Sequence, residues 1–162
     1  MAPLTVYRAA LWQIDHGRME YRTCTPIETA DLCAALLDQN FRESGLRGFD
    51  FCLNREAYEA LSIQGDSFGI VALDDGRPVG MVSVFVGPDP HITRAVALND
   101  TIFVLPEYRP RGIGGQLFVR AEREAKARGA VVFFWQVGIG SPLDQALQRR
   151  CAPDQVSYAR RL

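Results

Sequence analysis

The sequence predicts an α+β fold of three layers, in which helices cover both faces of a mixed, mostly antiparallel central sheet. Three observations predict it. Residues 67–105 hold a dense run of strand patterns, residues 94–137 read as strand, helix and strand, and residues 25–41 carry the apolar spacing of a helix. A strand–helix–strand unit crosses over in the right-handed sense and pairs its strands in parallel, which makes the sheet mixed.

The N-terminal part predicts one strand and two helices. Residues 19–24 alternate as a short strand does, and Thr25 then opens a helix as its N-cap. Pro26 occupies the first turn, and Glu28 stands three positions after Thr25, as in a capping box. The apolar stripe of this helix consists of Ile27, Ala30, Ala34, Leu37 and Phe41. Residues 54–61 predict the second helix.

The middle of the chain predicts three antiparallel strands in sequence. Residues 67–73 and 78–86 flank an Asp-Asp-Gly turn at 74–76, which is a hairpin signal. Residues 94–105 add the third strand of the meander.

The C-terminal third predicts alternating helices and strands. A helix runs from Gly114, and Gly129 suits its C-terminal cap. Residues 131–137 are too apolar for an exposed strand and predict a buried, central one. Residues 141–150 predict another helix, and residues 156–162 a closing strand.

Composition narrows the class of protein. The chain has 162 residues, 48% of them hydrophobic, and a formal net charge of −1. These values suit a single domain over residues 1–162, with residues 1–18 open between a helix, an edge strand and an N-terminal extension. They argue against a disordered chain and against a polybasic nucleic-acid binder. No apolar run reaches the roughly 18 residues of a membrane helix and no signal-peptide pattern is present, so we expect a cytoplasmic protein that binds neither nucleic acid nor membrane.

The cysteines predict no metal site. They are Cys24, Cys33, Cys52 and Cys151. None forms a CxxC pair and the chain has only two histidines. We expect reduced thiols in the core of the domain.

One segment, residues 104–117, carries the chemistry: it reads VLPEYRPRGIGGQL and joins a predicted strand to a predicted helix. A helix N-terminus presents N–H groups without intrahelical partners and a partial positive charge, so it binds anions. The glycines that let these amides approach a ligand are Gly112, Gly114 and Gly115. Arg109 and Arg111 add guanidinium groups that pair with phosphate oxygens. Together these groups suit a pyrophosphate.

The glycine spacing differs from that of other phosphate loops. No Lys-Ser or Lys-Thr pair follows, as a Walker A loop requires, and the glycines do not read GxGxxG. The alternative is a plain glycine-rich turn between strand and helix. The two arginines and the strand-before, helix-after setting favour the phosphate site.

The run RPRGIG at residues 109–114 resembles the R/Q-x-x-G-x-G/A signature of the GNAT superfamily, the acetyl-CoA-dependent N-acetyltransferases. The order of predicted elements over residues 19–162 is similar to the whole GNAT fold. The resemblance implies a splayed sheet, in which the strands before and after the glycine-loop helix separate into a V-shaped cleft. It also implies acetyl-CoA as acyl donor, with no metal.

The resemblance further implies which residues contact CoA. The backbone amides that would hold its pyrophosphate belong to Arg111, Gly112, Ile113, Gly114 and Gly115, with the side chains of Arg109 and Arg111 assisting. Backbone groups of Phe103 and Val104 would pair with the pantetheine amides. The Val104 N–H would polarise the thioester carbonyl, as an oxyanion-hole donor does.

Acyl transfer to an amine also needs a base. Unbroken strand alternation places Leu98, Asp100, Ile102 and Val104 on one face, and Asn99, Thr101 and Phe103 on the other. Asp100 is the candidate catalytic base or substrate anchor, because GNAT enzymes often carry a carboxylate or histidine base on this strand. The alternative is a solvent-exposed aspartate at the start of the strand.

The segment over residues 141–151 departs from the family pattern. Many GNAT enzymes have a tyrosine there that protonates the CoA thiolate, whereas Leu147 or a neighbour stands at that place here. Tyr158 lies further on, within the closing strand, where packing is expected. The general acid is therefore unassigned, and water is an alternative because a simple thiol has a pKa near ~8.5.

The remaining candidates receive ordinary structural roles. These are packing for Trp12 and Trp135, an exposed loop position for His91, an N-cap for Ser141, and no nucleophilic context for Cys151.

Two functions follow from these residues. The first is an enzyme that moves an acetyl group from acetyl-CoA to a primary amine by direct attack in a ternary complex. The second, motivated by the missing tyrosine, is a GNAT-fold module that binds acyl-CoA without turnover. The amine-bearing acceptor, a small molecule or a protein, would be recognised by residues 25–65 and 87–94, which carry no motif. A homodimer is possible.

Overall fold

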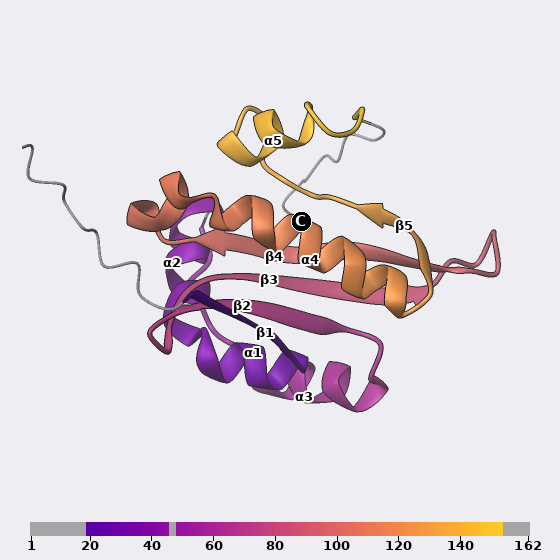
Figure 1. The fold of residues 1–162 in the computed structure, drawn as a ribbon. Helices are drawn as coiled ribbons and strands as arrows, with labels where there is room; N and C mark the ends of the chain where they lie inside the picture. The colour runs from indigo at the N-terminus through magenta and orange to yellow at the C-terminus, as the bar shows by residue number, and fades with distance from the viewer. Residues whose placement is uncertain (1–18, 46–47, 154–162) are drawn as a thin grey trace, which may run out of the picture.

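A computed structural model describes residues 19–45 and 48–153, and its centre is a five-stranded sheet in the order β1-β2-β3-β4-β5 (Figure 1). The strands are β1 (Met19–Cys24), β2 (Phe68–Asp74), β3 (Arg77–Pro88), β4 (Ala95–Val104) and β5 (Ala130–Phe134). The first four pair antiparallel and β4 pairs with β5 in parallel. The predicted mixed, mostly antiparallel sheet is confirmed.

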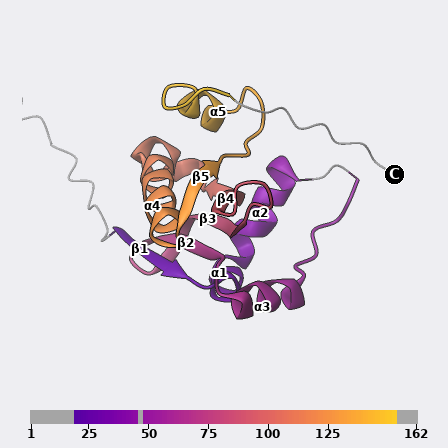
Figure 2. The same cartoon turned by 90° about the vertical axis from the view of Figure 1, so that its right-hand side faces the viewer.

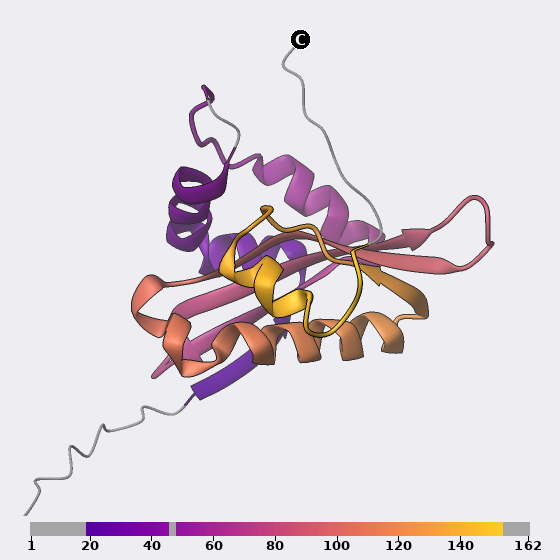
Figure 3. The same ribbon diagram turned by 90° about the horizontal axis from the view of Figure 1, so that it is seen from above.

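Helices cover both faces of this sheet. They are α1 (Pro26–Leu32), α2 (Ala34–Ser44), α3 (Arg55–Gln64), the 3-10 turn η1 (Pro106–Arg111), α4 (Ile113–Ala127) and α5 (Pro142–Leu147). Figures 2 and 3 show α4 along one face of the strands and α1, α2 and α3 on the opposite side, with α5 beyond the β5 edge. The three-layer α+β prediction is therefore confirmed.

The first predicted helix is two helices. Its start matches the prediction: the Glu28 N–H donates to Thr25 Oγ1 and the Thr25 N–H donates to Glu28 Oε2, which completes the capping box. The break falls at Cys33, whose φ of −112° and ψ of 19° leave the helical region. The break allows α1 to pack over β2 while α2 packs over β3 and β4.

The last described strand differs from its prediction. Residues 131–137 were expected to form a central strand, but β5 ends at Phe134 and pairs only with β4 among the described strands. Val131 and Val132 are 46% and 42% exposed at that edge. An apolar run predicts that its residues are buried, but it does not show whether strands on both sides or other elements bury them. The predicted closing strand at 156–162 lies outside the described residues, and α5 is shorter than the helix expected over 141–150.

The core lies between the sheet and α4 on one face and between the sheet and α1 and α2 on the other. The residues that α4 buries are Ile113, Leu117, Phe118, Ala121 and Ala125. Cys24 and Cys33 also lie in the core, and burial raises the pKa of the Cys33 thiol to about 12. Cys52 and Cys151 are exposed, so the expectation of four core thiols is wrong for these two.

Candidate active site

The strands β4 and β5 separate part of the way along β4. Their pairing runs from Ala95 to Leu98 on β4 and ends at Phe134 on β5, whereas β4 continues to Val104. The second half of β4 therefore lacks a strand partner on that side among the described residues, which matches the splay that the GNAT resemblance implies (Figure 1).

Asn99 lies at the point of separation and is only 2% exposed. Its Nδ2 donates to the Gln136 carbonyl over 2.9 Å, and its Oδ1 accepts from the Gln136 N–H over 2.6 Å. A side-chain amide has the same donor and acceptor as a peptide group. Asn99 thus satisfies the hydrogen-bonding groups of the Gln136 main chain, which lies just beyond the last main-chain pair between β4 and β5.

The register of β3 and β4 shows which backbone groups face the separated side. The Leu105 N–H donates to the Val79 carbonyl over 3.0 Å, so this is a hydrogen-bonded pair. Antiparallel pairs alternate, which turns the N–H and C=O groups of Phe103 toward β3 and those of Ile102 and Val104 away from it. Ile102, rather than the predicted Phe103, accompanies Val104 on the side where β5 has separated.

The glycine-rich segment forms the start of α4. Gly112 is the N-cap with φ of 75°, in the left-handed region where a side chain is strained, and no side chain caps the first turn. Ile113 is buried and anchors the turn, while Gly115 is exposed with nothing within 4 Å of the position of a Cβ. No side chain therefore caps the first-turn N–H groups of α4, and helix starts of this kind can bind anions.

Arg109 points toward the α2 layer. Its Nη2 donates to Glu43 Oε2 over 2.5 Å and its Nε donates to the Val104 carbonyl over 3.0 Å. The guanidinium also lies 5.5 Å from the centre of the Phe103 ring. Arg109 therefore ties the end of β4 to α2, a contact between residues far apart in the sequence that spacing alone could not predict.

Arg111 is held on the other side of the same turn. Its Nη1 donates to Asp74 Oδ2 over 3.0 Å, and its guanidinium lies 4.9 Å from the centre of the Tyr108 ring. The Tyr108 hydroxyl is hydrogen-bonded to Asp74, which raises the pKa of that tyrosine. Both arginines predicted to pair with phosphate are thus paired with carboxylates in the structure.

Asp100 occupies a β-bulge. Ser83 pairs with Thr101 and Val84 pairs with Asn99, so Asp100 is the extra residue on β4. The bulge puts Asn99, not Asp100, in phase with the alternation of Ile102 and Val104 beyond it. The shared face predicted for Asp100 and Val104 rested on unbroken alternation and does not follow here.

The surroundings of Asp100 still suit a proton acceptor. The residue is solvent-accessible, yet desolvation by its neighbours raises the pKa of its carboxyl, partly offset by the hydroxyl of Thr101 at 3.4 Å. Burial and then the nearby charge of Asp100 raise the pKa of Tyr58 on α3 to about 12. Asp100 thus belongs with the α3 side of the sheet.

Several other candidates take the structural roles expected of them. Ser141 caps α5 by accepting from the Asp144 N–H over 3.1 Å. Trp135 stacks on Phe133, with ring centres 4.2 Å apart, and donates to Glu122. Leu147 is buried, whereas His91 and Cys151 are exposed. Trp12 and Tyr158 lie outside the described residues.

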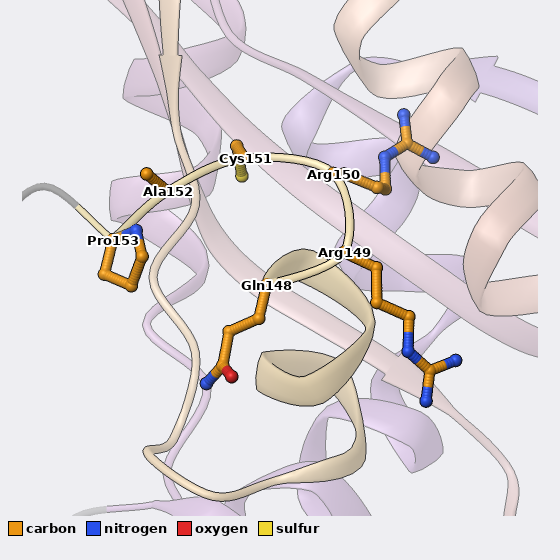
Figure 4. A pocket seen from close by; sticks show the side chains of 6 residues that line it. All are labelled: Gln148, Arg149, Arg150, Cys151, Ala152 and Pro153. Carbon is orange, nitrogen blue, oxygen red and sulfur yellow. The ribbon is translucent and has the colours of Figure 1, made fainter.

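A hollow elsewhere on the surface has no ligand-binding arrangement. It lies in the turn after α5 and is lined by Gln148, Arg149, Arg150, Cys151, Ala152 and Pro153 (Figure 4). Figure 4 shows these side chains spreading outward instead of converging, and Arg150 is paired with Glu122 over 3.0 Å. Within residues 19–45 and 48–153, no three His, Cys, Asp or Glu side chains form a metal-binding group. None of the helices described is both long and apolar enough to cross a membrane.

The fold and site define an α+β domain in which a glycine-rich helix start without a capping side chain follows a strand whose second half has no partner on one side among the described residues. The model of the acetyltransferase (GNAT) family matches residues 31–150. The chain therefore belongs to this family of acetyltransferases, as the sequence motif predicted. A search of curated protein sequences found no match.

Solved structures share the fold at low sequence identity. An aminoglycoside acetyltransferase from an uncultured soil metagenomic sample superimposes with a TM-score of 0.72 at 16% identity, over 89% of this chain and 95% of that one. A ribosomal-protein-alanine N-acetyltransferase from Brucella melitensis biovar Abortus 2308 gives 0.66 at 20% identity, over 90% and 100%. An aminoglycoside N-acetyltransferase in complex with CoA gives 0.66 at 18%, over 89% and 95%.

Proposed function

We propose that this protein transfers an acetyl group from acetyl-CoA to a primary amine by direct attack in a ternary complex. One observation carries the proposal: the half of β4 that is not paired with β5 leads through the short turn η1 into the first turn of α4, which no side chain caps. A diphosphate at the helix start would leave its attached arm free to run along the unpaired strand edge. The CoA complex of a structural neighbour supports this donor.

The chain offers a separate group for each part of the donor. The amides around Gly112 and Gly115 would hold the pyrophosphate. The outward backbone groups of Ile102 and Val104 would pair with the pantetheine amides as a neighbouring strand would. The Val104 N–H would donate to the thioester oxygen as negative charge develops there.

The reaction has a simple proton balance. The neutral amine attacks the carbonyl carbon, a C–N bond forms, and the C–S bond then breaks to release the CoA thiolate. Asp100 takes the proton that the attacking nitrogen loses, directly or through water. The thiolate takes a proton from solvent, since a simple thiol has a pKa near ~8.5.

The acceptor is an amine on a small molecule or a protein. The neighbours that act on aminoglycosides and on a ribosomal protein both have amine acceptors. Asp100 lies near Tyr58 of α3 and Glu43 lies on α2, so both carboxylates belong to the face of the sheet that these helices cover. There they would attract an ammonium group before it loses its proton.

The test measures thiol release from acetyl-CoA across a panel of polyamines, aminoglycosides and peptides. Release with at least one amine supports the enzyme. The Asp100→Asn variant should then lose about 10²–10⁴-fold in turnover with CoA affinity unchanged. If acetyl-CoA binds but no amine yields thiol above background, the second function applies: a binding module without turnover, which the tyrosine missing from residues 141–151 favours.

A further inference from the structure

We propose that Asn99 is a positioning residue that fixes where β4 and β5 separate, and thereby seats the acyl-pantetheine arm of the donor. The inference rests on the proposed function but concerns a residue that does not touch the reacting atoms. It starts from the two hydrogen bonds between the Asn99 side chain and the main chain of Gln136.

These two hydrogen bonds lie one step beyond the end of the parallel ladder between β4 and β5. Leu98 pairs with Phe134 at the last step of the parallel ladder. At the next step a regular parallel ladder would bond the Gln136 N–H to a main-chain carbonyl of β4. The side-chain amide of Asn99 takes that place instead, so the chain beyond β5 is held one side-chain length away from β4.

The β-bulge on the β3 edge of β4 also indicates that β4 changes direction at this point. Asp100 is the extra residue opposite β3, directly after Asn99. A bulge bends its strand and increases the local twist. The bend and the Asn99 bridge therefore act at consecutive residues, one turning β4 and the other setting its spacing from the chain after β5.

Because Asn99 is buried, its hydrogen bonds to Gln136 hold the two chain segments in one defined geometry. Asn99 is one of the four buried polar or charged residues in the described part of the chain. A buried amide whose donor and acceptor are both satisfied holds a defined geometry, because any displacement leaves polar groups without partners. An apolar side chain at this position would leave the Gln136 N–H and C=O to pair with the main chain of β4 or with water, and either change alters the opening.

The experiment compares Asn99→Ala and Asn99→Asp with Val71→Ala. Asp keeps the acceptor for the Gln136 N–H and loses the donor to its carbonyl. Val71 is fully buried in β2, two strands away from β4, so its variant reports loss of stability without a change at the opening. Calorimetric CoA affinity, amide exchange at Gln136 and the ratio of kcat/KM for acetyl-CoA and butyryl-CoA are measured where each variant is folded.

We expect Asn99→Ala to weaken CoA binding at least tenfold, to change the acyl-chain ratio at least fivefold and to lose protection of the Gln136 amide. Asn99→Asp should keep that protection and weaken CoA binding less. Val71→Ala should leave affinity and ratio within twofold of the parent. An affinity and ratio within twofold of the parent in both Asn99 variants would overturn the positioning role.

The two proposals fail in different ways. If the parent protein does not bind CoA, the proposed function is wrong, whatever the variants do. If the parent binds CoA and turns over acetyl-CoA, and the Asn99 variants have the same CoA affinity and acyl-chain ratio, only the role of Asn99 is wrong.

Discussion

Arg111 Nη1 donates to Asp74 Oδ2 over 3.0 Å, and this ion pair ties the turn before α4 to the end of β2. Asp74 is the more enclosed partner, with a side-chain exposure of 14% against 31% for Arg111. The guanidinium therefore supports the shape of the glycine-rich segment.

The ion pair predicts an effect of Asp74 on a ligand it does not touch. If Arg111 braces the loop, Asp74→Asn should weaken CoA binding several-fold and lower the free energy of unfolding by about 1 kcal/mol. A double-mutant cycle with Arg111→Leu should give a coupling of about 0.5–1.5 kcal/mol by urea unfolding. If Arg111 instead turns to phosphate, Asp74→Asn frees the guanidinium and CoA affinity rises, which would contradict the brace.

A second prediction concerns charge at the start of α4. Gly115 is exposed, has room for a side chain and lies in the first turn of the helix. An aspartate in a first turn stabilises a helix, so Gly115→Asp should fold at least as well as the parent. Its carboxylate should nevertheless repel a bound diphosphate and weaken CoA affinity at least tenfold relative to Gly115→Asn.

Asparagine is the matched control because it has the same shape without the charge. Calorimetric titration of CoA into both variants measures the difference. Equal affinities in the two variants would mean that no phosphate lies at this turn. Gly112 is the poorer site for this test, since its φ of 75° strains any side chain.

Local patterns in the sequence predicted local structure well. Thr25 and Glu28 are three residues apart, and their capping box forms as expected. The Asp-Asp-Gly turn joins β2 to β3, and the strand–helix–strand order correctly gave the parallel pair. Each of these features depends on neighbours in the chain, or on a handedness that most proteins share.

The features that escaped prediction depend on pairing across the chain. The bulge at Asp100 breaks an alternation that looks regular in the sequence, because its signal is a shift of the β3 partner. The carboxylates that hold Arg109 and Arg111 are far away along the chain, at Glu43 and Asp74. Asn99 offered only a weak signal: a buried amide needs hydrogen-bond partners, but Asp100 and Thr101 beside it are also polar, so the sequence does not show which of the three is buried.

The third prediction follows from the raised pKa of Asp100. A carboxyl whose pKa is higher in the folded than in the unfolded protein favours folding below its unfolded pKa of about 3.9, and that contribution is lost as the pH rises through the folded value. Asp100→Asn should therefore raise Tm relative to the parent at pH 7 by more than at pH 4. Thermal unfolding at both pH values measures this.

Asp100→Asn should lose turnover while it gains stability, which is typical of a residue that serves catalysis at a cost in stability. Thr101→Val is a useful control, since it removes the 3.4 Å hydroxyl contact and leaves the carboxylate in place. A gain in Tm for Asp100→Asn that is the same at both pH values would show that the carboxyl titrates normally.

The fourth prediction concerns how α1 sits on the sheet. A Cβ added at Gly69 on β2 would lie 2.0 Å from Thr29 Oγ1 and 2.8 Å from Thr29 Cβ. Rotation of the Thr29 side chain relieves the first contact but not the second, because Cβ is fixed to the backbone of α1. Gly69→Ala should therefore push α1 away from β2 and cost about 1–3 kcal/mol of unfolding free energy.

Gly87→Ala is the matched control, since Gly87 lies on the neighbouring strand β3 with nothing within 4 Å of the added Cβ. It should change the urea midpoint little. Combining Gly69→Ala with Thr29→Ala removes the contacts with Oγ1 and Cγ2 and leaves the contact with Cβ, so we expect the double variant to recover only part of the loss. Equal midpoints for Gly69→Ala and Gly87→Ala would mean that α1 does not rest directly on β2, and the acceptor side of the proposed active site would then need a different support.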